Sequence, residues 1–274
     1  MEKPETRIHP SAVVHPRARL DHGVHIGPGC VIDEFVSLGN NTRLDAHVFI
    51  TGHTAVGEDC RFFPYSAVGT EPQDVGYQQE DTRVEIGDRN LFREFMTINR
   101  GTPKDAQVTR IGNDNYFMAY SHIAHDCQVG SRIVFMNGVT LAGHCRIDDH
   151  AQISGFTGVH QFCRIGTYSY IGGHSVIIQD ILPFSKVAGG RPPLIYGTNA
   201  IGLRRLGFAR DRIKTIKDMF QLIFFSDLNT AQAVERIEKE FPPGEDRDEI
   251  LSFIRSSKRG IVKKLSDEWK KELA

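Results

Sequence analysis

Histidine residues gather in the middle of this 274-residue chain at a spacing that could support proton transfer. The segment AYSHIAHDCQVG, residues 119–130, places His122 and His125 beside Asp126, and His144 and His160 follow farther along the chain. Histidine is the side chain that most often removes a proton near neutral pH, and a carboxylate can orient its ring. These residues predict a general-base site if the fold brings them together.

A repeat of six residues indicates which elements would position these side chains. From Ile8 through Val14 and Leu20 to Ile177, large apolar residues recur at every sixth position, with interruptions near residues 69–85 and 102–110. An amphipathic helix has a period of 3.6 and a strand a period of two, so neither explains this spacing. A chain that turns a corner after each hexad closes a three-sided coil of about eighteen residues, and stacked coils pair as parallel strands.

The sequence therefore predicts an all-β left-handed parallel β-helix of hexapeptide repeats, followed by a C-terminal α-helical domain. The handedness comes from the hexapeptide prisms that the pattern resembles, because the repeat alone does not fix it. We expect the β-helix over residues 1–190, with inserted loops near 69–85 and 102–110, and the helical domain over residues 191–274. Apolar residues at helical spacing, including Ile213, Ile216 and Phe220, support this division, and the helices should cap the open end of the prism.

Stacking of residues eighteen apart predicts which histidines meet. His125 would lie beneath Gly143 and Gln161, and His144 would lie over Asp126. His160 would project one place to the other side of His125, so that three successive coils form one band of histidines. Neighbouring residues on a strand point to opposite faces, so Asp126 could assist His125 only if the chain twists locally.

A second column has little side-chain bulk. Ala119, Asn137, Gly155 and Gly173 are spaced eighteen apart and should stack on one face of the prism. Such a strip could form a groove for a long, thin ligand, although glycine could equally serve to ease a bend.

Cysteine usage and composition exclude several other roles. The five cysteines occupy the small inward place of the hexad, which favours buried apolar packing over a disulfide or a metal site. A formal net charge of −1 disfavours nucleic acid as a ligand. No apolar run reaches the ~18 residues of a membrane helix, and the start of the chain lacks the features of a secretory signal. We expect a cytoplasmic protein with no membrane span.

Several motifs together resemble one enzyme family, the UDP-N-acetylglucosamine acyltransferases that begin lipid A synthesis. The resemblance spans nearly the whole chain and rests on the hexads, EPQDVGYQQEDTRVEIGDRN, IAHDC, LAGH, VHQFCRIG and GLRRLGF. It implies a homotrimer with active sites between neighbouring prisms. It also implies transfer of a 3-hydroxyacyl chain from acyl carrier protein to the 3-position of the UDP-amino sugar, with no metal and no cofactor besides the acyl carrier thioester.

The same resemblance implies a role for each matching residue. His125 would be the general base, and the Gly143 backbone N–H would help stabilise the oxyanion. We count Asp126 with these catalytic residues because a local twist would let it orient the His125 ring. The residues expected to contact the substrates are His122, His144, His160 and Gln161 around the reacting groups, Gly155 and Gly173 along the acyl groove, Gln73 and Asp74 at the sugar, and Asn199 and Arg205 at the nucleotide.

Three positions depart from the family pattern. Gly76 stands where the family usually has lysine, Ile201 where it has an acidic residue, and Leu206 where it has an arginine. Leucine cannot imitate the directional contact of arginine with phosphate. These replacements leave open a variant that acylates a 3-amino-3-deoxy sugar and forms an amide instead of an ester.

Other classes fit the sequence less well. A γ-type carbonic anhydrase also uses a hexapeptide prism, but its three zinc-bound histidines must converge on one point, and this band spreads over two coils. Acetyl-CoA-dependent sugar acetyltransferases should lack the LRRLGF element, and the N-acyltransferase acting later in lipid A assembly carries a preceding domain for which these hexads leave no room. A non-catalytic scaffold would not need an ordered histidine band.

A basic cluster could receive the acidic acyl carrier protein or the diphosphate, or be a solvated helix face: Arg204, Arg205, Arg210, Arg212, Lys214 and Lys217.

Overall fold

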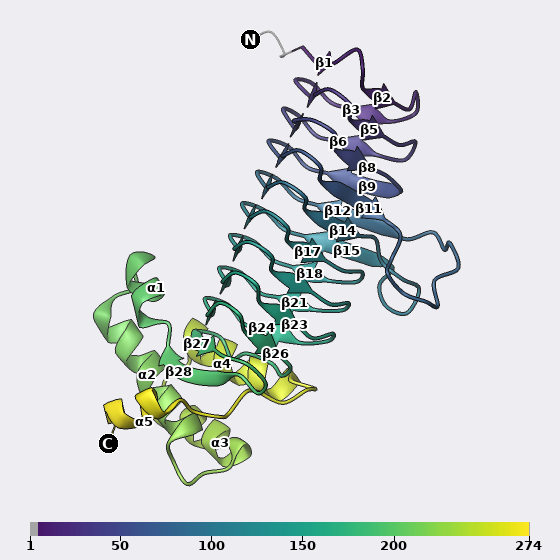
Figure 1. Ribbon diagram of the computed structural model, residues 1–274. Helices are drawn as coiled ribbons and strands as arrows, with labels where there is room; N and C mark the ends of the chain where they lie inside the picture. The colour runs from purple at the N-terminus through teal and green to yellow at the C-terminus, as the bar shows by residue number, and fades with distance from the viewer. Residues whose placement is uncertain (1–4, 274) are drawn as a thin grey trace.

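Three sheets, parallel except for the final pair β27 and β28, form the walls of a left-handed β-helix in the computed structural model, which describes residues 5–273. The coils stack along one axis from the first strand to the helices at the far end, and two loops project from one side near the middle (Figure 1). The predicted fold class is therefore confirmed.

Wall A is an 11-stranded sheet that continues into the C-terminal region. Its strands, in spatial order, are β1 (Arg7–Ile8), β4 (His25–Ile26), β7 (Arg43–Leu44), β10 (Arg61–Phe62), β13 (Leu91–Phe92), β16 (Tyr116–Phe117), β19 (Val134–Phe135), β22 (Gln152–Ile153), β25 (Tyr170–Ile171), β27 (Ser185–Ala188) and β28 (Leu194–Thr198).

Walls B and C complete each coil. The strands of wall B are β2 (Val13–Val14), β5 (Val31–Ile32), β8 (Phe49–Ile50), β11 (Ala67–Thr70), β14 (Thr97–Asn99), β17 (His122–Ile123), β20 (Thr140–Leu141), β23 (Gly158–Val159) and β26 (Val176–Ile177). The strands of wall C are β3 (Arg19–Leu20), β6 (Ser37–Leu38), β9 (His53–Val56), β12 (Arg83–Ile86), β15 (Val108–Ile111), β18 (Gln128–Val129), β21 (Arg146–Ile147) and β24 (Arg164–Ile165).

The strand register confirms that residues eighteen apart stack in coils without an insertion. His122 pairs with Thr140, and Thr140 pairs with Gly158. In two coils nearer the N-terminus, the paired residues are farther apart in sequence because the chain leaves the prism as a loop. Ala67 pairs with Thr97, with the loop at residues 71–82 between them, and Thr97 pairs with His122, with a second loop at residues 100–107 between them. The two loops thus lie next to the coil that carries His125.

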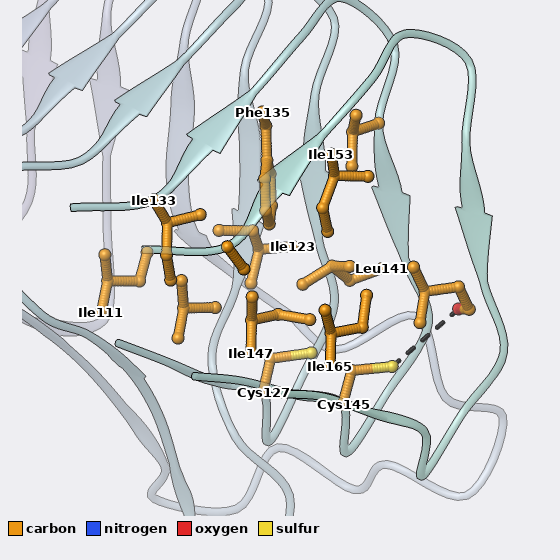
Figure 2. Packing of buried hydrophobic residues seen from close by; sticks show 14 of the residues in the cluster. Ile111, Ile123, Cys127, Ile133, Phe135, Leu141, Cys145, Ile147, Ile153 and Ile165 are labelled. Carbon is orange, nitrogen blue, oxygen red and sulfur yellow. Dashed lines mark hydrogen bonds between the residues drawn. The ribbon is translucent and has the colours of Figure 1, made fainter. Parts of the chain in front are cut away.

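The repeated apolar residue of each hexad fills the interior. Ile123, Leu141 and Ile153 are fully buried, and Figure 2 shows their side chains pointing into the common core. The rings of Phe62, Phe92 and Phe117 stack along the axis with centroids 4.5 and 5.3 Å apart. The apolar side chains of each coil pack against those of the next coil, so the core is continuous along the prism.

All five cysteines are free and buried. Cys127 and Cys145 lie in the core among the isoleucines (Figure 2). Burial raises the pKa of the Cys60 thiol to about 11 and that of the Cys163 thiol to about 12. Since the thiolate is the form that reacts or binds metal, these residues serve as small buried apolar groups.

Helices cover the far end of the prism. They are α1 (Ala200–Arg205), α2 (Arg210–Phe224), α3 (Thr230–Glu240), α4 (Glu245–Ser256) and α5 (Asp267–Leu273). The buried face of α2 includes Ile213, Ile216 and Phe220, as the helical spacing predicted. The Arg164 guanidinium of β24 lies 4.2 Å from the Phe253 ring of α4, which joins the last coil to the helices. The boundary predicted at residue 190 falls between β27 and β28, which pair with each other, and the domain division stays a prediction.

Candidate active site

The corner between walls B and C carries the predicted histidine band. We call residues 124–126, 142–144 and 160–162 the histidine corner. Its three coils follow β17, β20 and β23, whose pairing sets the vertical register. His125, His144 and His160 therefore share one corner, as the sequence predicted.

A local turn brings Asp126 onto the same side as His125. The backbone of Asp126 has a φ of 59°, in the left-handed region that residues other than glycine rarely adopt. Its Oδ2 atom lies 2.9 Å from Nδ1 of the His125 ring. This turn is the local twist that the sequence required for Asp126 to assist its neighbour.

The Asp126 carboxylate is buried and fully engaged. Its side chain is 1% exposed. Thr102 donates its backbone N–H to Oδ1 at 2.9 Å and its hydroxyl to Oδ2 at 2.6 Å. Burial raises the pKa of the Asp126 carboxyl, but hydrogen bonds from His125 and Thr102 outweigh this effect and hold the pKa below its usual value. The group is therefore a charged acceptor that fixes the His125 ring with Nδ1 as donor.

His144 packs beside this pair. Its ring meets the His125 ring edge-on with centroids 5.1 Å apart and stacks on Phe162 at 4.5 Å. Its Nε2 atom lies 3.7 Å from Asp126 Oδ2, and its Nδ1 atom lies 3.4 Å from Asp105 Oδ2. His144 is thus held between the buried carboxylate and an aspartate of the loop at residues 100–107.

Gly143 leaves the space into which the His125 ring projects. A Cβ atom at Gly143 would lie 2.4 Å from Cε1 and 2.7 Å from Nε2 of His125. Among the described residues, neither the Gly143 N–H nor His125 Nε2 has a hydrogen-bond partner. An unpaired backbone donor and an unpaired ring nitrogen therefore belong to residues that lie against each other on neighbouring coils.

The other histidines occupy the edges of the site. His122 Nδ1 lies 2.8 Å from the Thr97 hydroxyl, and burial, followed by the nearby His125, lowers the pKa of His122. His160 is exposed, and its Nδ1 atom lies 3.2 Å from the Gln161 carbonyl oxygen. Gln161 is also exposed at the top of the His125 column.

The potential metal ligands at this corner differ from the histidine triad of a γ-type carbonic anhydrase. Ligand atoms of His125, Asp126 and His144 lie within 4.8 Å of one another in the described chain, and His160 is not in this group. The Asp126 carboxylate in this group already accepts hydrogen bonds from Thr102 and His125. Three histidines therefore do not converge on one point, in agreement with the weaker fit of that class to the sequence.

The loop at residues 71–82 places the predicted sugar-binding residues beside the second loop. Asp74 forms an ion pair with Lys104, and its other oxygen accepts the Gly76 N–H at 2.8 Å. The hydrogen bond from Lys104 is the main cause that lowers the pKa of Asp74. A Cβ atom at Gly76 would lie 3.4 Å from Lys104 Nζ, so an ammonium group stands beside the missing side chain. Gln73 is exposed and lines an open groove with Glu71 and Arg100.

The predicted nucleotide-binding residues line a cavity at the start of the helices. The cavity has a volume of about 570 Å³, and Asn199, Ile201 and Arg205 line it. The Asn199 side chain also caps α1 by accepting the Gly202 N–H at 3.2 Å. Leu206 ends α1 and is 48% exposed. The structure thus gathers Asn199 and Arg205 at one cavity. Helix α1 lies at the helical end of the molecule, whereas the two loops leave the middle of the prism (Figure 1).

The bare column lies at the other edge of wall B. Gly155 and Gly173 sit at the corner between walls A and B, and a Cβ atom at Gly173 would lie 3.3 Å from the Gly155 carbonyl oxygen. Gly173 is exposed. The strip is therefore open on its outer side, with wall B between it and the histidine corner.

Charge partners divide the basic cluster. Arg212 pairs with Asp246 at 2.7 Å, and Lys214 pairs with Asp218 at 2.7 Å, so carboxylates already neutralise both. Four other members of the cluster form no ion pair with the described residues: Arg204, Arg205, Arg210 and Lys217.

None of the described helices has the combined length and apolar character needed to cross a bilayer.

Sequence reasoning missed the residues of the second loop. Thr102, Lys104 and Asp105 contact Asp126, Asp74 and His144 respectively. The only sequence signal was the break in the hexad period near residues 102–110, which marks an insertion but not where it folds.

Comparisons with known proteins show which family the chain resembles. The family model described as UDP N-acetylglucosamine O-acyltransferase, domain 2, matches residues 180–262, and a model of bacterial transferase hexapeptide repeats matches residues 109–143. Acyl-[acyl-carrier-protein]–UDP-N-acetylglucosamine O-acyltransferase of Alkalilimnicola ehrlichii is 46% identical, over 94% of this chain and 100% of the relative. The protein of the same description from Stenotrophomonas maltophilia strain R551-3 is 42% identical, over 94% of this chain and 98% of the relative.

Solved structures show the same likeness in three dimensions. The UDP-N-acetylglucosamine acyltransferase of Francisella novicida superposes with a TM-score of 0.91 at 37% identity, covering 96% of this chain and 98% of that chain. The enzyme from Bacteroides fragilis superposes with a TM-score of 0.90 at 39% identity, covering 93% of this chain and 100% of that chain.

Proposed function

Because the chain belongs to the UDP-N-acetylglucosamine O-acyltransferase family, we propose that it transfers a 3-hydroxyacyl chain from acyl carrier protein to the 3-hydroxyl of UDP-N-acetylglucosamine, with His125 as general base. The observation that carries the proposal is the hydrogen bond between the buried Asp126 carboxylate and the partly exposed His125 ring, which lies against Gly143. This arrangement supplies a base, an orienting carboxylate and an oxyanion donor on one corner.

In the proposed reaction, His125 Nε2 removes the proton from the sugar hydroxyl as its oxygen attacks the thioester carbonyl carbon. The new C–O bond gives a tetrahedral intermediate, and the Gly143 N–H stabilises the oxygen that becomes negative. The C–S bond then breaks, and the departing sulfur takes the proton from His125. Asp126 keeps Nδ1 protonated throughout, so that Nε2 is free to accept and return the proton.

We assign the remaining predicted residues to binding. His122, His144, His160 and Gln161 surround the reacting groups, while Gln73 and Asp74 contact the sugar. Asn199 and Arg205 contact the nucleotide, and the open column at Gly155 and Gly173 receives the acyl chain. The cavity between Asn199 and Arg205 and the exposure of Gly173 support these assignments.

Two further properties belong to the proposal. The enzyme acts as a homotrimer with active sites between neighbouring prisms. The exposure of His160 and Gln161 at the histidine corner, and of Gly173 at the opposite edge of wall B, accords with this proposal. It also needs no metal and no cofactor other than the acyl carrier thioester. Sedimentation equilibrium tests the first property, and metal analysis of active enzyme together with assay in the presence of a chelator tests the second.

An amide-forming variant is the second candidate, and the replacements at three positions favour it. Gly76 and Leu206 lack polar side chains, and Ile201 places an apolar side chain in the cavity shared by Asn199 and Arg205. Lys104 beside Gly76 supplies an ammonium group from the second loop, which supports the ester reaction as the first choice.

One assay separates the two candidates. Purified protein is incubated with a 3-hydroxyacyl carrier thioester and either UDP-N-acetylglucosamine or its 3-amino-3-deoxy analogue, and released thiol is measured. We expect faster release with UDP-N-acetylglucosamine and a product that mild alkali cleaves, as an ester requires. Release with the amino sugar alone, giving an alkali-stable product, would replace the first candidate by the second, and no release with either sugar would refute both.

A further inference from the structure

The loop at residues 100–107 reaches the proposed catalytic pair through Thr102. Thr102 is 1% exposed and Asp126 is 2% exposed, so the contact between them is shielded from water. The Thr102 hydroxyl lies 2.6 Å from Asp126 Oδ2, the same oxygen that accepts from His125 Nδ1 at 2.9 Å. One carboxylate oxygen therefore joins the loop to the histidine ring.

The backbone of the loop is built to hold Thr102 in place. A Cβ atom at Gly101 would lie 2.3 Å from the Val108 nitrogen, so the two ends of the loop pass each other closely. The Arg83 N–H donates to the Gln107 carbonyl at 3.0 Å, which ties the end of the loop to wall C. The Thr102 N–H then donates to Asp126 Oδ1 at 2.9 Å. The carboxylate is held by two donors of one residue and cannot rotate away from His125 without losing one of them.

We propose that Thr102 is a positioning residue for catalysis: its two hydrogen bonds fix the Asp126 carboxylate, and through it the orientation and tautomer of His125. This inference rests on the proposed role of His125 and adds a residue outside the hexad repeat. Thr102 acts through Asp126, since its own hydroxyl faces the carboxylate and not the open side of the corner.

The chain offers a matched control in Thr109. Thr109 is also fully buried, and its hydroxyl accepts the backbone N–H of Asp126 at 2.9 Å. Both threonines thus contact Asp126 from the same coil, but only Thr102 contacts the carboxylate. Replacing either by valine removes one buried hydroxyl with little change in volume.

Thr102→Val should lower kcat by about 10- to 100-fold with a small change in KM, because a charged acceptor loses a donor and gains rotational freedom. The Asp126 pKa should rise for the same reason, so the part of the acidic limb of the kcat/KM profile that reflects protonation of Asp126 should move to higher pH. Thr109→Val should lower the melting temperature without moving that limb, and Thr102→Ser should restore both kcat and the profile. The titratable groups around the pair, which are the same in all variants, are His122, His144, Asp74, Lys104 and Asp105.

A second measurement does not depend on turnover. The Nδ1–H signal of His125 in a 15N-histidine-labelled enzyme, assigned by its loss in His125→Ala, should broaden or shift in Thr102→Val and stay in place in Thr109→Val. If Thr102→Val does not fold, the pair Thr102→Ser and Thr102→Ala gives the same comparison, with the hydroxyl present only in serine.

Equal kcat, pH profile and Nδ1–H signal in Thr102→Val and wild type would overturn the inference, as would matching effects of Thr102→Val and Thr109→Val. Full activity in His125→Ala would refute the proposed base instead. In that event the NMR comparison alone still decides whether Thr102 positions the ring.

Discussion

The two corners that border wall B use the same backbone turn for different purposes. At the corner between walls A and B, the left-handed positions hold a ladder of rings: His47 stacks on Tyr65, Tyr65 on Phe95, and Phe95 on Tyr120, with centroids 5.3, 5.1 and 4.8 Å apart. At the histidine corner, the equivalent positions are Asp126, His144 and Phe162, with φ values of 59°, 60° and 64°.

The difference lies in what the turn must support. The ladder needs only like rings on successive coils, each pair contributing about 0.5–1.5 kcal/mol beyond its area, and its Tyr65 and Tyr120 remain more than half exposed. The histidine corner holds a buried carboxylate, which would be costly without donors. Two of those donors come from Thr102 of the loop at residues 100–107, outside the repeat, and the third is His125 Nδ1. The repeat thus provides equivalent backbone positions on successive coils, and the inserted loop supplies the donors that let one of them hold a buried carboxylate beside His125.

Among substitutions that leave His125 itself in place, the largest effect should come from Asp126→Asn. The amide keeps the shape of the carboxyl, but its NH₂ group only donates. At the Oδ1 position it would face the Thr102 N–H, and at the Oδ2 position it would face the Thr102 hydroxyl and His125 Nδ1, so either a Thr102 contact or the His125 tautomer is lost. We expect kcat to fall by about 10²- to 10⁴-fold. Steady-state assays with the acyl carrier thioester measure it, with a thermal melt as the folding control; a folded variant within threefold of wild type would contradict the orienting role.

Gly143→Ala should come next. Its Cβ atom would lie 2.4 Å from His125 Cε1, so the ring must move. A displacement near 1 Å can cost about 10²-fold in rate, and we expect a loss of that order in kcat. The backbone N–H remains in this variant, so an unchanged rate would show that the His125 ring does not need the space over Gly143.

Gly173→Met probes the corner between walls A and B. It should change the preferred length of the acyl donor more than it changes kcat. A Cβ atom at Gly173 meets only the Gly155 carbonyl at 3.3 Å and Ser154 Cβ at 3.9 Å, so the prism should tolerate it. If the column receives the acyl chain, the kcat/KM ratio of short to long donors should rise by about tenfold or more. The donor preference of Gly173→Ala should lie between those of wild type and Gly173→Met. The same preference in all three proteins would contradict binding of the acyl chain at this corner.

Lys104→Met should have the smallest effect. Lys104 is about half exposed, and its hydrogen bond is the main cause of the low pKa of Asp74. We expect the KM for the sugar nucleotide to rise by about three- to tenfold with little change in kcat. The Asp74 pKa should rise without its partner, so the KM should begin to increase at a higher pH on acidification than in wild type. Lys104→Arg keeps the charge and should preserve most of the affinity; equal KM values for the methionine and wild-type enzymes would exclude Lys104 from binding.

The sequence predicted the features that repeat. Hexad spacing was enough to assign the prism, the vertical register of His125, Gly143 and Gln161, and the buried cysteines. It could not orient Asp126, because a strand would point that side chain away from His125 and only the observed φ reverses it.

Contacts made by the insertions were also beyond sequence reasoning. Thr102, Lys104 and Asp105 have no periodic position, so their distance along the chain says nothing about which coil they reach. The same holds for Asn199, whose role as a helix cap depends on where α1 begins.

The central claim is that His125 is the general base, and His125→Ala tests it most directly. His150 provides the control, since it occupies the left-handed position of another corner and stacks on Tyr168 at 4.5 Å. Single-turnover acyl transfer should fall by about 10²- to 10⁴-fold in His125→Ala and stay within about twofold of wild type in His150→Ala. Turnover in a folded His125→Ala enzyme within a few-fold of wild type would contradict the account.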